Sequence, residues 1–198
     1  CQTDVAYLDL QKAFDSVCHH TLLLKLRSEV CGNTWRIRKL YLDNRVQFVS
    51  VNNCHSGFLP VTSGVPQGSI SGPLLFSLFM NDLLLTPLHS SLLLYADDNK
   101  CRRAISFEAD CLLQEDLERI GDWGVESRLH FNFGKTFAMR FHGPRSIPFY
   151  FDYSFLKSSV ETHDSCRDLG VNFTDNLSLS SQTRAVLPHQ TCSSIEAT

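Results

Sequence analysis

The sequence predicts one domain of the mixed α+β class. Its 198 residues fit a single ordinary domain, and a hydrophobic fraction of 43% is enough for a sizeable core, which argues against disorder. Segments with the alternation typical of strands are interspersed with segments that repeat apolar residues at helical spacing. Aspartates stand at the ends or turns of several predicted strands. The chain shows no internal repeat or low-complexity tract.

The first third of the chain predicts a strand, two helices and a pair of strands. A largely apolar run surrounds Asp9, which favours a buried strand. Leu22, Leu23 and Leu26 form the apolar stripe of a helix. In order, these elements are expected at 4–10 (strand), 19–30 (helix, capped by Ser16), 34–43 (helix), and 46–51 and 58–62 (paired strands).

The remainder continues the alternation of helices and strands. A loop rich in Gly, Pro and Ser precedes Pro73, which suits a helix start because its missing N–H leaves no bond unmade there. Asp97 and Asp98 follow one apolar strand and precede another, as at the tip of a hairpin. The elements are expected at 63–71 (loop), 73–83 (helix), 92–96 (strand), 97–99 (turn), 100–105 (strand), from 106 (helix, capped by Ser106), and 136–141 and 168–173 (strands). The residues from 185 onward show little pattern.

The composition argues against a secreted or membrane protein. The eight cysteines contain no CxxC pair and no matching histidine spacing, so they predict free thiols in a reducing compartment rather than disulfides or a zinc site. No apolar stretch is long enough to span a membrane, and no signal peptide is visible. The expected location is intracellular, in the nucleus or cytoplasm. The absence of an initiating Met indicates that the sequence begins inside a longer protein.

The net charge of −3 is unusual for a complete nucleic-acid enzyme, which normally carries a basic face. The charge is unevenly distributed, because six basic residues and only two acidic ones lie between Lys25 and Arg45. Such a patch could contact phosphates. An ordinary solvated helix face explains it almost as well.

The acidic residues suggest a metal site. Asp9 alone is explained by a salt bridge, and an isolated Asp-Asp pair is usually a surface turn. In combination, an acid in one strand and Asp97 and Asp98 at a neighbouring hairpin tip can converge, and clustered carboxylates repel each other unless cations lie among them. Oxygen ligands of this kind suit Mg²⁺, two of which can act together in displacement at phosphorus.

Five segments resemble the motifs of reverse transcriptases, in the order of that family. The most specific is VTSGVPQGSISGPLLFSLFMNDL at 61–83, in the form found in non-LTR (LINE-like) retrotransposons, whereas YADD at 95–98 alone is a weak signal. The others are YLDLQKAFDSVCH at 7–19, LHFNFGKTFAMRF at 129–141 and RDLGVNFTDNLSL at 167–179. The resemblance implies a polymerase palm, an antiparallel sheet backed by helices, with the fingers and thumb largely missing.

The resemblance also implies a set of metal ligands. Asp9 and Asp97 would be the principal ligands, with Asp98 beside them and the backbone carbonyl of Leu10 assisting. Leu10 would also belong to the residues that bind the nucleotide. The implied cofactor is a pair of Mg²⁺ ions, with Mn²⁺ as the alternative. Asn99, Ser71 and Cys18 depart from the family pattern, but none of these positions is a metal ligand.

Four more residues receive roles from the resemblance. Phe14 would form the floor of the sugar pocket and exclude a 2′-hydroxyl, although a core Phe is the simpler interpretation of that residue alone. Gln67 and Gly68 would contact the incoming nucleotide or the template. Lys135 would protonate or neutralise pyrophosphate, or is an ordinary surface lysine.

The resemblance implies RNA-directed DNA polymerisation, with an RNA template, a DNA primer and dNTP as partners and no membrane. The palm is expected at 1–180, and an irregular tail or thumb remnant at 181–198. Two alternatives stay open from the sequence. The chain could be an inactive retroelement remnant, or a nucleic-acid-binding module that keeps only the fold.

Overall fold

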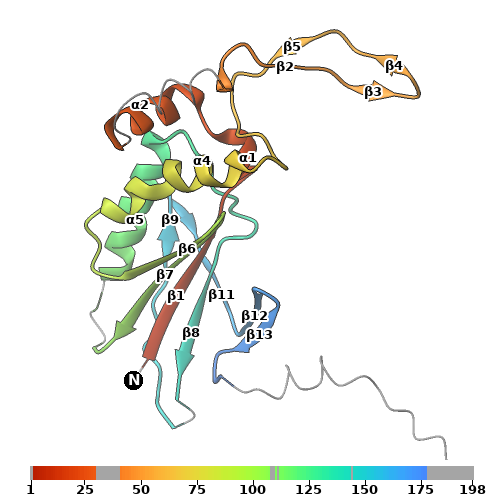
Figure 1. Ribbon diagram of the computed structural model, residues 1–198. Helices are drawn as coiled ribbons and strands as arrows, with labels where there is room; N and C mark the ends of the chain where they lie inside the picture. The colour runs from red at the N-terminus through yellow and green to blue at the C-terminus, as the bar shows by residue number, and fades with distance from the viewer. Residues whose placement is uncertain (1, 30–40, 108–109, 111, 144, 178–198) are drawn as a thin grey trace, which may run out of the picture.

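A five-stranded sheet forms the centre of the protein. The computed structural model describes residues 2–29, 41–107, 110, 112–143 and 145–177. In spatial order the strands are β11 (Glu161–His163), β8 (Phe137–His142), β1 (Gln2–Asp9), β7 (Asp98–Ile105) and β6 (Ser91–Tyr95). All neighbours are antiparallel except β11 and β8, which are parallel. Strand β1 therefore lies in the middle, hydrogen-bonded on both sides (Figure 1).

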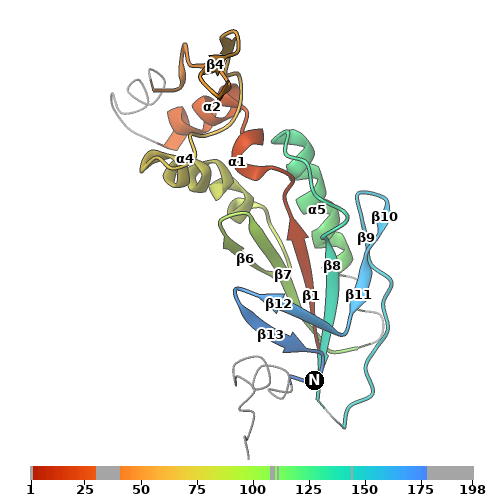
Figure 2. The same cartoon turned by 90° about the vertical axis from the view of Figure 1, so that its right-hand side faces the viewer.

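Helices cover one face of this sheet, and a small hairpin lies on the other. The helices are α1 (Ala13–Ser16), α2 (His19–Glu29), α4 (Ser71–Met80), the 3-10 helix η1 (Asn81–Leu85) and α5 (Leu112–Glu126). Strands β9 (Ser154–Phe155) and β10 (Ser158–Ser159) pair beside α5. The hairpin of β12 (Ser165–Asp168) and β13 (Val171–Thr174) crosses the face opposite α5 (Figure 2). The sheet is thus backed by helices, as expected for a palm.

The side chains of β1 alternate between the two faces. Asp4, Ala6 and Leu8 are buried under the helices, whereas Tyr7 and Asp9 lie on the open face and are partly exposed. Successive strand residues point to opposite faces, so burial of one set turns the other set outward. The apolar residues of this strand therefore determine where its last carboxylate points.

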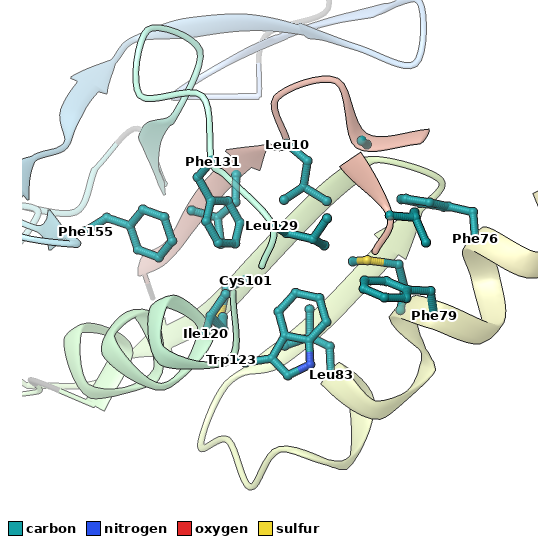
Figure 3. Packing of buried hydrophobic residues seen from close by; sticks show 14 of the residues in the cluster. Leu10, Phe76, Phe79, Leu83, Cys101, Ile120, Trp123, Leu129, Phe131 and Phe155 are labelled. Carbon is teal, nitrogen blue, oxygen red and sulfur yellow. The ribbon is translucent and has the colours of Figure 1, made fainter. Parts of the chain in front are cut away.

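The core fills the space between the sheet and the helices (Figure 3). Phe76, Phe79 and Leu83 project from α4 and η1, and Ile120 and Trp123 project from α5. All five are buried. Burying a side chain of this size contributes about 1.5–3 kcal/mol, so the apolar stripes of α4 and α5 are the main attachment of the helices to the sheet.

An arm of paired strands extends from the helical end of the molecule (Figure 1). Its four two-residue strands are β2 (Val46–Gln47), β3 (Ser50–Val51), β4 (Cys54–His55) and β5 (Leu59–Pro60). Strand β2 pairs with β5 and β3 with β4, so the expected pairing of 46–51 with 58–62 is confirmed in part.

Several sequence predictions were wrong in detail. Ser16 ends α1 and donates to the carbonyl of Gln11, so it does not cap α2. Helix α5 begins at Leu112, whose N–H donates to Asp110 Oδ1 at 3.3 Å, so the cap is Asp110 and not Ser106. The strand expected at 168–173 is the turn and flanks of the β12–β13 hairpin. The helix expected at 34–43 and the tail from 181 lie largely or wholly outside the described residues.

The sequence predicted free cysteines and no membrane-spanning segment. Cys18, Cys54, Cys101 and Cys166 are all free thiols. A helix able to span a membrane is absent from the described part of the chain.

Lys25, on α2, joins this helix to α4, to η1 and to the end of α5. Its ammonium donates to the carbonyl of Phe79 and to Asp82 Oδ1, both at 2.8 Å, and to Ser127 Oγ at 3.3 Å. The indole N–H of Trp123 donates to the same Asp82 oxygen at 3.1 Å. The Lys25 side chain is 13% exposed, so these hydrogen bonds are largely shielded from water.

We predict that Lys25→Met lowers the free energy of unfolding by about 2 kcal/mol, because Asp82 loses its cation while partly buried. Urea denaturation measures this quantity. Arg27→Met, on the exposed side of the same helix, is the matched control and should change stability by less than about 0.5 kcal/mol. Equal stability of the two variants would contradict a structural role for Lys25.

Candidate functional site

The aspartate pair lies at a tight hairpin between β6 and β7. Tyr95 pairs with Asp98, so the loop consists of Ala96 and Asp97 alone. Ala96 has φ of +54°, the left-handed conformation that two-residue hairpin loops require. The predicted turn at 97–99 was therefore wrong by one residue at its start, and Asp98 already belongs to β7.

Asp98 lies directly opposite Asp9 on the neighbouring strand β1. Residues opposite one another in an antiparallel pair project from the same face, with Cβ atoms about 4.5–5.5 Å apart. The Asp9 side chain is 21% exposed. The two carboxylates predicted from separate motifs, 89 positions apart in the chain, are thus neighbours on the open face of the sheet.

The pKa of Asp98 is raised above its ordinary value of 3.8. Burial is the largest cause, and the charge of Asp97 is the next. Lys100 opposes the rise, and Asp168 and Asp9 add to it. Burial and three neighbouring carboxylates thus both disfavour the ionised form of Asp98, and a bound cation would favour that form.

Lys135 reaches the same place from the loop before β8. The N–H of Asn132 donates to the carbonyl of Asp9 at 2.8 Å, and Lys135 N donates to Asn132 O at 3.0 Å. This backbone linkage brings Lys135 Nζ to 3.7 Å from Asp9 Oδ2, with the lysine side chain 69% exposed. The lysine is near the carboxylates yet still free to reach toward solvent.

Leu10 follows Asp9 and makes an isolated bridge with Phe131. The bridging hydrogen bonds are made by its neighbours, with Gln11 N donating to His130 O and Asn132 N donating to Asp9 O. Because the flanking residues form those bonds, the carbonyl of Leu10 turns away from Phe131. This orientation is compatible with its predicted role, which stays a prediction.

A cleft of about 360 Å³ opens at these carboxylates. One side consists of Asp9, Asp98 and Lys135, and the other is formed by the β12–β13 hairpin. The cleft is lined by Tyr7, Leu8, Asp9, Asp98, Asn99, Lys100, Gly134, Lys135, Phe137, His163, Arg167, Asp168 and Leu169. Tyr7, Phe137 and His163 form a continuous ring stack across it, with centroid separations of 4.7 and 4.6 Å.

The sequence reasoning missed the second side of this cleft. Lys100 and Asp168 were not singled out, although they stand within or beside quoted motifs. The strand period of two indicates that Lys100 shares a face with Asp98. No pattern in the sequence indicates that Asp168, 68 positions later, lies beside it.

Besides Leu10, the three residues predicted to bind the nucleotide lie elsewhere. Phe14 stacks on Phe76 with ring centroids 4.4 Å apart. Gln67 lines a second cavity, of about 620 Å³, and its amide donates to Asp15 Oδ1 at 2.9 Å. Gly68 has φ of +77° with open space around it. None of the three lines the cleft at Asp9 and Asp98.

Gly64 holds the loop of Gln67 against α1. Its φ is +87°, and a Cβ atom there would lie 3.0 Å from the Cα and carbonyl oxygen of Asp15. His19 Nε2 lies 2.7 Å from the Gly64 carbonyl, as expected if the ring donates to it. A residue without a side chain is therefore needed for this close approach.

The donor set at the cleft fits a divalent cation in its chemistry. Asp9 and Asp98 supply oxygen ligands from facing positions, and their accumulated negative charge favours a cation. Among the described residues, however, no group of three or more His, Cys, Asp or Glu side chains is arranged to hold a metal ion. The role of Asp97 as a principal ligand together with Asp9 therefore stays a prediction.

Comparisons with known proteins match this chain to one family. The family described as "Reverse transcriptase (RNA-dependent DNA polymerase)" matches residues 2–173. The RNA-directed DNA polymerase from mobile element jockey of Drosophila funebris is 33% identical over 144 residues, which are 68% of this chain and 16% of that protein. The probable RNA-directed DNA polymerase from transposon BS of Drosophila melanogaster is 32% identical over 162 residues, 73% of this chain and 17% of that protein.

A solved structure agrees with the fold. Apo telomerase from Candida tropicalis, truncated from its C-terminal domain, matches with a TM-score of 0.60 at 12% identity. The match covers 89% of this chain and 35% of that chain. The α+β architecture is thus that of a polymerase palm. Because the family match extends over nearly the whole described chain, the protein belongs to the reverse transcriptase family.

Proposed function

We propose that the chain forms the palm of an RNA-directed DNA polymerase, which transfers nucleotides from dNTP to a primer 3′-hydroxyl on an RNA template. The observation that carries the proposal is the pairing of Asp9 with Asp98 across β1 and β7, beside Lys135. The jockey and BS relatives are named for this activity, and the chain spans 16% and 17% of their lengths. The palm is proposed to occupy residues 1–180.

Asp9 and Asp97 are proposed as the principal ligands of divalent metal ions, with Asp98 beside them and the backbone carbonyl of Leu10 assisting. Two Mg²⁺ ions, or Mn²⁺ as the alternative, would lower the pKa of the primer hydroxyl and neutralise charge on the triphosphate. The residues themselves contribute position. Asp9 is fixed by the middle strand of the sheet and Asp98 by the hairpin, so neither carboxylate has to be ordered when substrate arrives.

Lys135 is proposed to act on the pyrophosphate leaving group. It stands 3.7 Å from Asp9, and most of its side chain is exposed. An exposed ammonium on a flexible stem can reach phosphate oxygens and donate a proton to them. Its loop is bonded to the end of β1, so its backbone is fixed while its exposed side chain extends toward the position of a substrate.

Phe14, Gln67 and Gly68 are proposed to receive the nucleotide. Stacking on Phe76 fixes the ring of Phe14, which is suitable for a rigid pocket floor. The amide of Gln67 is bonded to Asp15 near the surface, and the open space at Gly68 allows close approach of a ligand to the backbone. Gln67 lines the second cavity, and none of the three residues lines the cleft beside the β12–β13 hairpin.

We predict that Asp98→Asn lowers primer extension at least about 100-fold on an RNA template with dNTP and Mg²⁺, because the site loses half of its facing carboxylate pair. Asp152→Asn removes an exposed carboxylate elsewhere and should leave extension unchanged. Extension by the Asp98→Asn variant at the wild-type rate would exclude the proposed role of this pair. No extension by the wild-type chain would contradict activity for this chain.

A second prediction concerns stability without metal. The pKa of Asp98 is raised in the folded chain, so ionised Asp98 costs stability at pH values above that pKa, and the cost disappears as the pH falls through it. Asp98→Asn should therefore raise the melting temperature at pH 7 in EDTA. The difference from wild type should shrink as the pH is lowered into the carboxyl range.

Mg²⁺ provides the complementary measurement. Added Mg²⁺ should raise the melting temperature of the wild type more than that of Asp98→Asn, because binding to the folded state stabilises it. Asp152→Asn is again the control and should respond as the wild type does. An equal response of wild type and Asp98→Asn to Mg²⁺ would show that the ion does not bind at this pair.

A further inference from the structure

The β12–β13 hairpin lies on the open face of the central sheet without being part of it. Within the described part of the chain, strand β12 pairs with β13 alone, and neither strand joins the five-stranded order. A backbone bond from His142 N to Asp175 O, at 3.1 Å, attaches the base of the hairpin to the end of β8. Because no strand among the described residues pairs with its far end, side chains must determine where the hairpin tip lies on the sheet, whose face it crosses in Figure 2.

Two side-chain contacts attach β12 to the sheet. Tyr7 and Lys100 lie directly opposite one another on β1 and β7, so both project from the open face. Cys166 and Asp168 are two residues apart on β12, so both can project toward that face. Lys100 Nζ donates to both oxygens of Asp168, at 2.5 and 2.7 Å, and the Tyr7 hydroxyl bonds to the Cys166 thiol.

The Lys100–Asp168 pair differs from an ordinary surface ion pair. The two side chains are only 12% and 16% exposed, and Lys100 Nζ also lies 5.8 Å from the centre of the Tyr7 ring. Exposed pairs contribute little, because water screens them and holding two long side chains costs entropy. A shielded pair with two hydrogen bonds resists separation, because either partner left alone would be a poorly solvated charge.

We propose that the Lys100–Asp168 pair is a latch that fixes the β12–β13 hairpin over the cleft and thereby positions the template–primer against Asp9 and Asp98. The latch joins the two sides of the cleft, because Lys100 belongs to the strand of Asp98 and Asp168 belongs to the hairpin. Arg167 and Leu169, the residues on either side of Asp168, line the same cleft. The effect of the latch on catalysis rests on the proposed function, whereas its effect on the position of the hairpin does not.

The positions of the proposed nucleotide-binding residues indicate that the latch affects the binding of template–primer rather than that of dNTP. Phe14, Gln67 and Gly68, proposed for the nucleotide, do not line the cleft that the hairpin covers. Asp9, Asp98 and Lys135, which are proposed to act on the triphosphate, do line it, but they are held by β1, β7 and the loop before β8 and not by the hairpin. A displaced hairpin should therefore disturb binding of the nucleic acid in the cleft much more than binding of dNTP. Lys100 and Asp168 are positioning residues in this proposal, because neither has to touch the reacting atoms.

The test compares Lys100→Met, Asp168→Asn and the double variant with the wild-type chain. Arg102→Met is the matched control, because Arg102 lies two residues along the same strand, on the same face, and is exposed. Lys100→Arg retains the cation and should behave as the wild type. Hydrogen exchange of residues 165–174 reports the hairpin, and steady-state primer extension reports the KM for template–primer and the KM for dNTP separately.

A latch predicts that both single variants change in the same direction. Exchange at 165–174 should rise about tenfold, and the KM for template–primer should rise about tenfold while the KM for dNTP stays within about twofold. The double variant should be no worse than either single variant, because both remove one interaction. A direct electrostatic effect on the carboxylates would instead act in opposite directions, since one variant removes a cation and the other an anion.

Two results would overturn the latch. The first is unchanged exchange at 165–174 in both single variants. The second is a KM for template–primer that changes in opposite directions, or independently, in the two single variants. A KM for dNTP that rises as much as the KM for template–primer would have the same meaning. If the wild-type chain extends no primer, the proposed function fails, and hydrogen exchange alone then decides whether the pair holds the hairpin.

Discussion

The register between β1 and β7 is the constraint on which the site depends. It pairs Asp9 with Asp98 on the open face, and the same register pairs Ala6 with Cys101 and Leu8 with Asn99 under the helices. A slip by one residue would turn every side chain of a strand to the other face. Two like charges facing each other would disfavour this register by themselves. The buried pairs enforce it, so the core beneath the sheet holds together carboxylates that repel each other above it.

The tip of the β6–β7 hairpin is locally unfavourable in free energy, and the stability of the same core must compensate for it. Ala96 adopts a left-handed backbone, which is unfavourable for a residue with a Cβ atom. Asn99 is buried beneath the tip and donates to the Asp97 carbonyl at 3.2 Å, but its Oδ1 accepts no hydrogen bond from the described residues. A buried acceptor without a hydrogen bond lowers the free energy of unfolding by about 1–3 kcal/mol. Such local violations are typical of functional sites, where the surrounding structure must compensate for them.

Local patterns predicted the elements well and their ends less well. The alternation around Asp9 predicted β1, and the apolar stripe of α5 predicted its buried face, because both patterns reflect burial directly. The turn at Ala96 was misplaced because Asp and Asn favour turns more strongly than Ala does, whereas strand pairing decided the outcome. The facing of Asp9 and Asp98 followed from recognising motifs. The pairing of Lys100 with Asp168 did not, since no local rule relates two charges so far apart in the chain.

The distribution of charge at the cleft explains why cations would be needed there. Asp9, Asp98 and Asp168 line it together with three basic residues, Lys100, Lys135 and Arg167. Lys100 is neutralised by Asp168, and Lys135 lies beside Asp9. The basic side chains are thus largely balanced by the acids already present, and Asp98 still has a raised pKa. A polyanionic substrate could not enter this environment favourably on protein charge alone. The ion pair of the latch therefore leaves the Lys100 ammonium unable to neutralise the substrate. Divalent ions bound between the carboxylates would supply the missing positive charge.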